Sequence, residues 1–453
     1  MNSLKSISPI DGRYLSQVED LATYFSEMAL MRYRLVVEIE YLIALAHHHG
    51  VAECLEFTPE QVDDVRNIYR NFSDRDAMAV KQREQTTNHD VKAVEYFLKE
   101  QLQKKGLQEW SSFIHFALTS EDINNLAYSM MWSDAVSEVY RPCLKKLLKT
   151  ITTFAQIHAN QPMLALTHGQ SATPTTVGKE YAVFASRLNR QMEQLIRHRC
   201  QGKFDGATGT WSAHVVAYPD VDWLQFSTDF ITRLGLDPNL LTIQIESHDS
   251  LAESFHIISR INTILIDLCR DTWLYISRGI FSQQKKQGEV GSSTMPHKIN
   301  PIQFENAEGN LGIANAYFTH LAEKLPISRM QRDLTDSTVL RNQGIPLAHS
   351  LLACKNILNG FSRLTVNATK LDEELEQHWE VLAEAIQTIL RKHGHDDAYE
   401  QLKTFTRGQQ VTKDSLNTFV ATLTIPESDK QRLLSLTPQS YTGLAQSLVS
   451  HTL

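Results

Sequence analysis

Apolar residues recur every three or four positions along most of this chain, most regularly between residues 253 and 281. In that segment the apolar positions form one continuous stripe along a long helix. Ile257, Ile264 and Trp273 fall outside the stripe, so a second face of the same helix is apolar as well. Apolar character on two faces is typical of helices packed inside a bundle, which is the architecture we expect here.

Comparable helical periodicity extends through much of the remaining chain, whereas strand-like alternation is scarce. Further long helices are predicted over residues 21–49, 91–103, 123–149, 174–200, 303–325 and 345–364. The best candidate for a strand is the short alternating run LTIQI at residues 241–245. We therefore predict an all-α chain with three domains: an N-terminal helical domain over residues 1–110, a central long-helix bundle over 111–365 and a C-terminal helical domain over 366–453.

Composition and charge exclude several classes of function. The net charge of −8 carries no electrostatic signature of nucleic-acid binding, and an anionic substrate would need locally placed Arg and Lys residues. No segment has the roughly 18 consecutive apolar residues that a membrane span requires, and no signal peptide is recognisable. The five cysteines are scattered, which argues against a disulfide framework and a structural zinc site. We expect a soluble, cytoplasmic protein that binds neither nucleic acid nor membrane.

Polar clusters precede several of the predicted helices. Thr87 or Asn88 can cap the helix that begins near residue 91, Thr119 and Asp122 have the spacing of a capping box, and Thr173 can cap a helix that starts at Pro174. The Asn300–Pro301 pair repeats that last pattern. Helix starts present unpaired N–H groups, which suit carboxylate and phosphate binding.

Capping alone does not explain three of these polar residues. It accounts for Thr87, Thr173 and Pro301, but it does not call for the histidines His89 and His168. A glycine beside His168 and another beside Ser292 allow the backbone to approach a ligand closely. We therefore assign function to His89, His168 and Ser292.

Two other chemistries find little support. A Ser-His hydrolase would need a G-x-S-x-G elbow between a strand and a helix, and the sequence lacks it. The histidines at 47–49 sit at a predicted helix end, where cationic side chains favour the helix dipole. His393 and His395 have no carboxylate or cysteine at ligand spacing in the sequence. No metal site is predicted.

A group of arginines lies near residues 329–341. Arg329, Arg332 and Arg341, together with Ser337, could clamp a phosphate through charge-assisted hydrogen bonds. An ordinary charged surface is an equal alternative, because acidic residues are interleaved with the arginines. The pair Arg13–Tyr14 is ambiguous in the same way.

Several motifs together resemble one enzyme family over nearly the whole chain. They are SPIDGRY at 8–14, TTNHDVKAVEYFLKE at 86–100, FIHFALTSEDINN at 113–125, THGQ at 167–170, QIE at 244–246, GSSTMPHKINP at 291–301 and RDLTDSTVLRN at 332–342. The form GSSxMPxKxNP is shared across the fumarase/aspartase superfamily. The second and last motifs resemble the adenylosuccinate lyase family in its longer bacterial form.

The resemblance implies a fumarase/aspartase-like helical homotetramer whose active sites are each built from three subunits. It implies fumarate release from adenylosuccinate and from the succinylated carboxamide ribotide of purine biosynthesis, without a metal or an organic cofactor. In the implied site Ser292 is the general base, His168 is the general acid, and His89 lies near the substrate phosphate or His168. The substrate-binding residues implied are Arg13, Tyr14, Asn88, Asp90, Thr119, Ser120, Gln244, Lys298, Asn300, Arg329, Arg332, Ser337, Thr338 and Arg341.

Within this set, the resemblance implies that Lys298 and Asn300 bind the succinyl carboxylates together with Thr119 and Ser120. It implies that Gln244 binds the nucleotide base or its carboxamide equivalent. The implied ligands of the nucleotide phosphate are Arg13, Tyr14, Arg329, Ser337 and Arg341. Gln85, Ser171 and Ser247 depart from the family pattern, which has arginine, proline and proline there. Two rivals remain, namely another fumarate-releasing lyase such as argininosuccinate lyase, and a catalytically silent helical scaffold.

Overall fold

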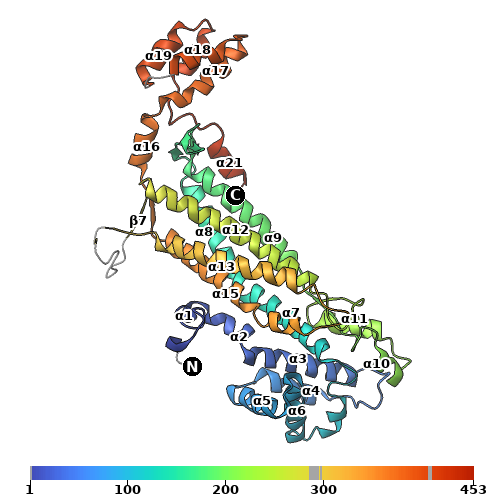
Figure 1. Ribbon diagram of the computed structural model, residues 1–453. Coiled ribbons are helices and arrows are strands. Elements are labelled where there is room, and N and C mark those ends of the chain that lie inside the picture. Colours follow the sequence, from blue (N-terminus) through green and yellow to red (C-terminus); the bar gives the residue numbers. More distant parts are fainter. Residues whose placement is uncertain (1–2, 285–294, 296–297, 407–410, 453) are drawn as a thin grey trace. The chain divides into compact units, whose positions relative to one another are not determined.

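The computed structural model describes residues 3–284, 295, 298–406 and 411–452, and these residues are overwhelmingly helical (Figure 1). The strands among them are only two or three residues long and form two-stranded pairs. The predicted all-α class is therefore confirmed. None of the described helices is both long and apolar enough to cross a membrane.

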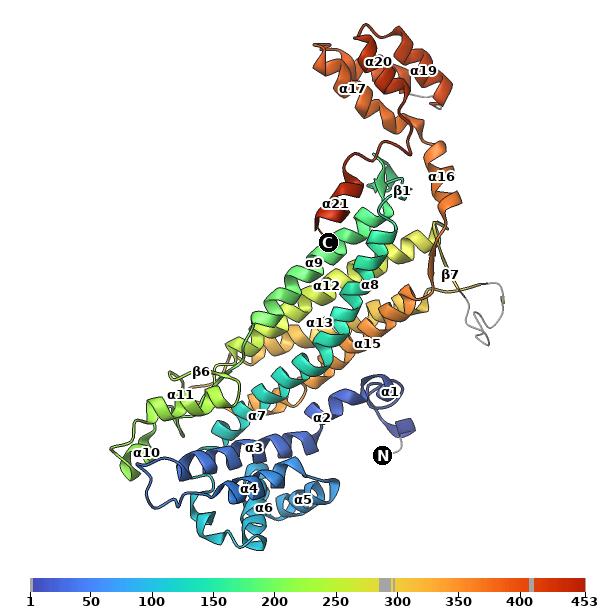
Figure 2. The same cartoon turned by 180° about the vertical axis from the view of Figure 1, so that it is seen from behind.

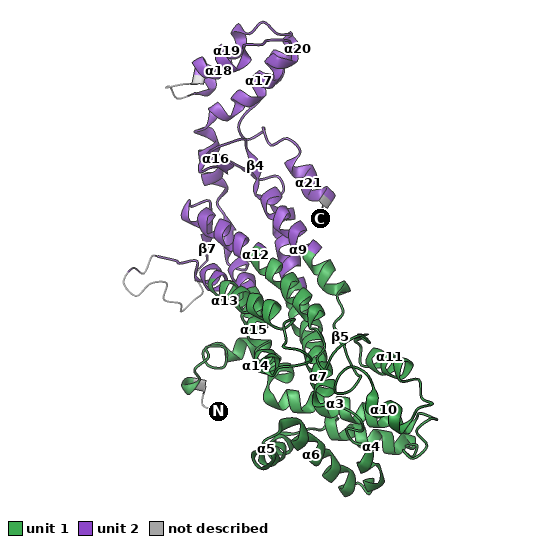
Figure 3. Cartoon of the chain, turned by 45° about the vertical axis from the view of Figure 1, so that its right-hand side comes forward, with its two compact units in different colours: residues 1–144, 191–263, 309–355 green, residues 145–190, 264–308, 356–453 purple. Residues whose placement is uncertain are grey.

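The chain divides into two compact units that do not follow sequence order (Figure 3). Unit 1 comprises residues 1–144, 191–263 and 309–355, and unit 2 comprises residues 145–190, 264–308 and 356–453. Both units receive residues from the long helices α8 (Arg141–Ile157), α9 (Val177–Arg197), α12 (Asp249–Ser277), α13 (Ile302–Lys324) and α15 (Gly344–Phe361). The three consecutive domains expected from the sequence stay a prediction.

The long helix predicted over residues 253–281 corresponds to α12. Its predicted stripe is buried, as at Phe255, Ile258 and Leu268, which are each 0% exposed. Ile257 and Ile264 on the second apolar face are buried too. The period of the apolar residues therefore located this helix to within four residues at each end.

Unit 1 is built largely around α3 (Glu27–Ala46), which contacts α4 (Pro59–Arg70), α6 (Asp90–Lys104) and α7 (Ser120–Ala135) (Figure 1 and Figure 2). The helix predicted over residues 21–49 is broken at Ser26, because Ser26 is extended and its side chain caps α3 by accepting the Ala29 N–H. The remaining elements of unit 1 are η1 (Ser3–Lys5), α1 (Leu15–Val18), η2 (Glu19–Leu21), α2 (Ala22–Phe25), α5 (Asp74–Thr87), η3 (Gln108–Phe113), the π-helix η4 (Val136–Tyr140), β5 (Gln201–Gly202), α10 (Ser212–Ala217), α11 (Trp223–Arg233), β6 (Asp237–Pro238) and α14 (Thr335–Leu340).

Unit 2 joins parts of the long helices to a group of short helices with its own apolar core, which includes Trp379, Ile386 and Leu416. Three antiparallel pairs connect its segments: β1 (Pro162–Met163) with β4 (Thr175–Thr176), β2 (Leu166–Thr167) with β3 (Gln170–Ser171), and β7 (Phe281–Gln283) with β8 (Leu364–Val366). Its other elements are α16 (Ala368–Glu376), η5 (Trp379–Leu382), α17 (Ala383–Lys392), α18 (Ala398–Thr406), α19 (Lys413–Thr422), α20 (Glu427–Leu434) and α21 (Ala445–Thr452).

Two local predictions in these regions were wrong. The segment 241–245 is not a strand, because its polar groups bond to the loop at 205–209: Thr242 donates to Asp205, and Gln244 Nε2 donates to the Ala207 carbonyl over 3.0 Å. Thr173 does not cap α9. Its hydroxyl donates to Glu384, and Thr176 caps instead by accepting the Lys179 N–H.

Candidate functional site

A carboxylate held between two arginines lies in unit 1. Asp90 Oδ2 is 2.7 Å from Arg34 Nη2 and 2.7 Å from Arg341 Nη2. Arg34 is 3% exposed and also donates to Asn124 Oδ1. Burial alone would raise the pKa of Asp90, but the two guanidinium groups outweigh it and hold that pKa well below its usual range. Two predicted substrate-binding residues, Asp90 and Arg341, are thus in contact, and we call the group with Arg34 the arginine clamp.

His89 caps α6, which contradicts the expectation that Thr87 or Asn88 would do so. Its Nδ1 accepts the Lys92 N–H over 3.2 Å. The cause is Asn88, whose left-handed backbone (φ 49°) ends α5 and leaves His89 extended, as an N-cap must be. The His89 ring is exposed.

The start of α7 is fixed by buried charges. Asp122 Oδ2 accepts the Thr119 N–H over 2.9 Å, which confirms the predicted pairing of these two residues. The Lys203 ammonium lies 3.0 Å from Asp122 and 2.8 Å from Asp205, and all three side chains are fully buried. Thr119 and Ser120 therefore begin a helix whose N-terminus is held in place by this buried ion-pair network.

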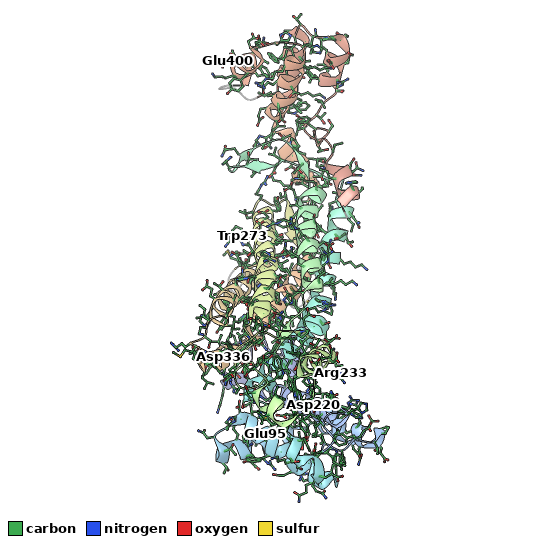
Figure 4. All side chains as sticks on the ribbon, turned by 90° about the vertical axis from the view of Figure 1, so that its right-hand side faces the viewer. Glu95, Asp220, Arg233, Trp273, Asp336 and Glu400 are labelled. Carbon is green, nitrogen blue, oxygen red and sulfur yellow. The ribbon has the colours of Figure 1, made fainter. Side chains whose placement is uncertain are left out.

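Gln244 and Arg332 also meet. Arg332 Nη1 donates to Gln244 Oε1 over 3.3 Å, and Arg332 Nη2 lies 3.2 Å from Glu121 Oε2. Close by, Glu121, His248 and Asp336 each place one ligand-type atom within 4.8 Å of the others, the only such buried trio of potential metal ligands found among the described residues (Figure 4 labels Asp336). Burial raises the pKa of Glu121 to about 8 and lowers that of His248 to about 4.

Other predicted residues of unit 1 lie at its surface. The Arg329 side chain is 80% exposed and pairs with Asp333. The Arg13 guanidinium carbon lies 5.9 Å from the centre of the Tyr14 ring. Ser337 is half-buried in α14, where its N–H donates to Asp336 Oδ1, and its neighbour Thr338 is exposed.

The predicted residues of unit 2 that the structure describes lie outside its helices. His168 occupies the tip of the β2–β3 hairpin with a left-handed backbone (φ 54°), followed by Gly169 (φ 75°), so both central residues have the positive φ of a tight hairpin turn. The His168 ring is exposed. Lys298 is exposed as well, and Asn300 is half-buried two residues before α13. Ser292 lies outside the described residues.

The start of α13 differs slightly from the prediction. The Pro301 carbonyl accepts the N–H groups of Phe304 and Glu305, so Pro301 occupies the cap and the helix proper begins at Ile302. The sequence predicted Asn300 as the cap, one residue earlier.

Sequence reasoning missed several residues of this site. Arg34 directly precedes the apolar run at residues 35–37 of α3, a signal that could have been noticed. Glu121, His248 and Asp336 lie inside or beside recognised motifs, but no local spacing shows that their side chains meet. Outside this site, His393, which has no carboxylate at ligand spacing in the sequence, bonds Asp429 over 2.6 Å, a carboxylate 36 residues away.

Comparison with known proteins identifies the family. A family model described as "Lyase" matches residues 12–314, and one described as "Adenylosuccinate lyase C-terminal" matches residues 328–442. The chain is 50% identical to the adenylosuccinate lyase of Haemophilus influenzae and 49% identical to that of Escherichia coli, in each case over 99% of both chains. Its fold is similar to that of the 3-carboxy-cis,cis-muconate lactonizing enzyme from Pseudomonas putida, with a TM-score of 0.75, 22% identity and coverage of 96% of each chain. The chain belongs to the adenylosuccinate lyase family.

Proposed function

We propose that this chain is a C–N lyase that releases fumarate from adenylosuccinate, giving AMP, and from succinylaminoimidazole carboxamide ribotide, giving aminoimidazole carboxamide ribotide. The observation that carries the proposal is the 50% identity to an adenylosuccinate lyase over 99% of both chains. We further propose a cytoplasmic homotetramer with three domains in each chain and with active sites shared between subunits.

The reaction is a β-elimination with two proton transfers. Ser292 Oγ takes the proton from the β-carbon of the succinyl group, and the electron pair left behind is delocalised into the adjacent carboxylate. This pair forms the double bond of fumarate as the C–N bond breaks, and His168 gives a proton to the departing nitrogen. The substrate's own carboxylate is the electron sink, so the step requires no metal or organic cofactor. Lys298 stabilises the ionised Ser292 and, with Asn300, Thr119 and Ser120, holds the succinyl carboxylates.

The nucleotide is held by the other predicted residues. Arg341 contacts the phosphate together with Arg13, Tyr14, Arg329, Ser337 and Thr338, while Asn88, His89 and Asp90 line the same end of the substrate. Gln244 and Arg332 face the base or its carboxamide equivalent. The arginine clamp supports this assignment, because Asp90 fixes the Arg341 guanidinium in one orientation. Such local positive charge is what an anionic substrate needs in a chain of net charge −8.

Turnover of adenylosuccinate and of argininosuccinate, followed by ultraviolet absorbance and product analysis, tests this function. We expect adenylosuccinate to be converted to equal amounts of AMP and fumarate, and argininosuccinate to be left intact. We expect no turnover of argininosuccinate because a cationic guanidino substrate does not need the arginines at 329–341. Turnover of argininosuccinate alone would show that the substrate proposed here is wrong. Absence of turnover with either substrate from a well-folded chain would favour the silent scaffold.

A further inference from the structure

Four side chains from three segments of unit 1 meet at Arg332, one of the proposed substrate-binding residues. Glu121 follows Ser120 at the start of α7, His248 follows the loop that carries Gln244, and Arg332 and Asp336 come from the segment that ends in α14. Arg332 Nη2 lies 3.2 Å from Glu121 Oε2 and 3.8 Å from Asp336 Oδ2. We call these four residues the buried hub.

The hub leaves polar atoms without partners. Glu121 and His248 are each 1% exposed, and Asp336 is 3% exposed. Within the described part of the chain, no hydrogen-bond partner reaches Glu121 Oε1, His248 Nε2 or Asp336 Oδ2. Buried polar atoms are rarely left unpaired, because an unmade hydrogen bond costs the full desolvation of the group. Two carboxylates also face a single guanidinium, so fully ionised acids would leave one buried negative charge.

A proton or a divalent cation could remove that charge, and the surroundings favour the proton. The Arg332 guanidinium already occupies the space beside both carboxylates, and a divalent cation there would be repelled by it at short range. Burial raises the pKa of Glu121 to about 8, and it lowers the pKa of His248 to about 4. At neutral pH the glutamic acid is protonated and the imidazole is neutral, so the Glu121 hydroxyl becomes a donor among acceptors.

The hub also controls the position of Gln244. Arg332 Nη1 donates to Gln244 Oε1, while Gln244 Nε2 donates to the Ala207 carbonyl. The amide is therefore held at both ends, and one of those ends depends on Arg332. A shift of the guanidinium within the hub would rotate or displace the amide that faces the substrate base.

We propose that uncharged Glu121 is a positioning residue that, together with His248 and Asp336, fixes Arg332 against Gln244 and thereby governs selectivity between the two proposed substrates. This inference rests on the proposed function. The purine of adenylosuccinate is a closed ring, whereas the carboxamide of the ribotide can rotate to follow a displaced amide. Loosening the hub should therefore weaken the binding of adenylosuccinate more than the binding of the ribotide.

The test compares Glu121→Gln with Glu121→Ala. Glutamine keeps the shape of the side chain and supplies an uncharged donor, so we expect its KM for both substrates to stay within about twofold of the unmodified chain. Alanine should raise the KM for adenylosuccinate about tenfold, raise it less for the ribotide, and leave kcat less affected. Equal damage from the two variants would show that an ionised carboxylate is required and would overturn the proposal.

Glu38→Gln is the matched control, because Glu38 is also fully buried but uses both of its oxygens. It accepts from His115 Nδ1 over 2.6 Å and from the His115 N–H over 3.1 Å. We expect Glu38→Gln to lower the thermal unfolding midpoint by several degrees, and Glu121→Gln to leave it unchanged or raise it. A Glu121→Gln protein as destabilised as the control would contradict an uncharged Glu121.

Two further measurements separate the remaining outcomes. Elemental analysis of the purified chain should find no stoichiometric divalent metal. A bound metal that is lost in Glu121→Gln would show that a cation, not a proton, neutralises the buried hub, and would overturn the proposal. If the unmodified chain turns over neither substrate, the proposed function fails by itself. The unfolding midpoints then still decide whether Glu121 is uncharged.

Discussion

The two units differ in how they present the residues proposed to act on the substrate (Figure 3). In unit 1, Arg341 is held by Asp90, which the buried Arg34 contacts as well, and Arg332 is held by the buried Glu121, although Arg329 lies at the surface. In unit 2, His168 lies exposed on a hairpin turn, and Lys298 is exposed outside the helices. Unit 1 thus has binding groups whose orientation is already fixed by packed helices, which suits recognition of the nucleotide. The exposed groups of unit 2 suit bond breaking in a site that partner subunits complete, as proposed above.

The largest effect is expected from the proposed acid and base, which lie in unit 2. His168→Ala and Ser292→Ala should each lower kcat by about 10²–10⁴-fold, because proton transfer is lost while the nucleotide contacts of unit 1 remain. Steady-state kinetics with adenylosuccinate measures the effect, and circular dichroism checks that the fold is intact. Normal turnover by either variant would remove that residue from the assignment.

A smaller effect of a different kind is expected from unit 1. Arg341→Met removes a charge-assisted contact to the phosphate, so the KM for adenylosuccinate should rise about 10–100-fold with a smaller change in kcat. Arg66→Met is the control, because Arg66 also pairs with a carboxylate, that of Glu40, through two hydrogen bonds, but has no proposed substrate contact. Equal rises in KM for both variants would show that general damage, not phosphate binding, explains the result.

The smallest effect concerns the pH dependence of the free energy of unfolding. In unit 1, Asp90 and Glu121 should contribute to this dependence with opposite signs. The pKa of Asp90 is lowered on folding, so its contribution is present above its unfolded pKa and is lost as the solution becomes acidic. The pKa of Glu121 is raised to about 8, chiefly by burial; Arg332 and Lys203 oppose the shift, and Asp336 and Asp122 add to it. Folded Glu121 therefore binds more protons than unfolded Glu121 between about pH 4.5 and 8, and stability falls as pH rises through that window.

Urea unfolding of the unmodified chain and of Glu121→Gln at pH 5.5 and 7.5 measures this contribution, at one fixed protein concentration. Glutamine cannot titrate, so the variant should lose less stability over that interval, by at most about 1.4 kcal/mol for each pH unit. Identical pH dependence in the two proteins would mean that Glu121 titrates alike in the folded and unfolded states.

The periodicity of the sequence predicted the long helices well, because a 3.6-residue repeat of apolar positions is a local signal that packing reinforces. The helix expected over residues 253–281 spans Asp249–Ser277, and the pairing of Thr119 with Asp122 depends on neighbours three residues apart. Local patterns of this kind require no knowledge of the remaining chain.

Features that depend on distant segments were not predictable in this way. The run at 241–245 alternates like a strand, yet the loop at 205–209 takes up its hydrogen bonds. The cap at His89 follows from a left-handed Asn88, a backbone state that the sequence permits without requiring. The buried hub joins residues more than 200 positions apart, so its pKa shifts could not be inferred from any one motif. The resemblance located the motifs, and the contacts between them come from the fold.

The division of roles between the units is tested most directly by the equilibrium affinity for AMP, measured by calorimetry on His168→Ala and Arg341→Met side by side. AMP lacks the succinyl group, so its binding reports on the nucleotide contacts alone. We predict an affinity within about twofold of the unmodified chain for His168→Ala, and a loss of about 10–100-fold for Arg341→Met. Equal losses of AMP affinity in the two variants would contradict the assignment of binding to unit 1 and of chemistry to unit 2.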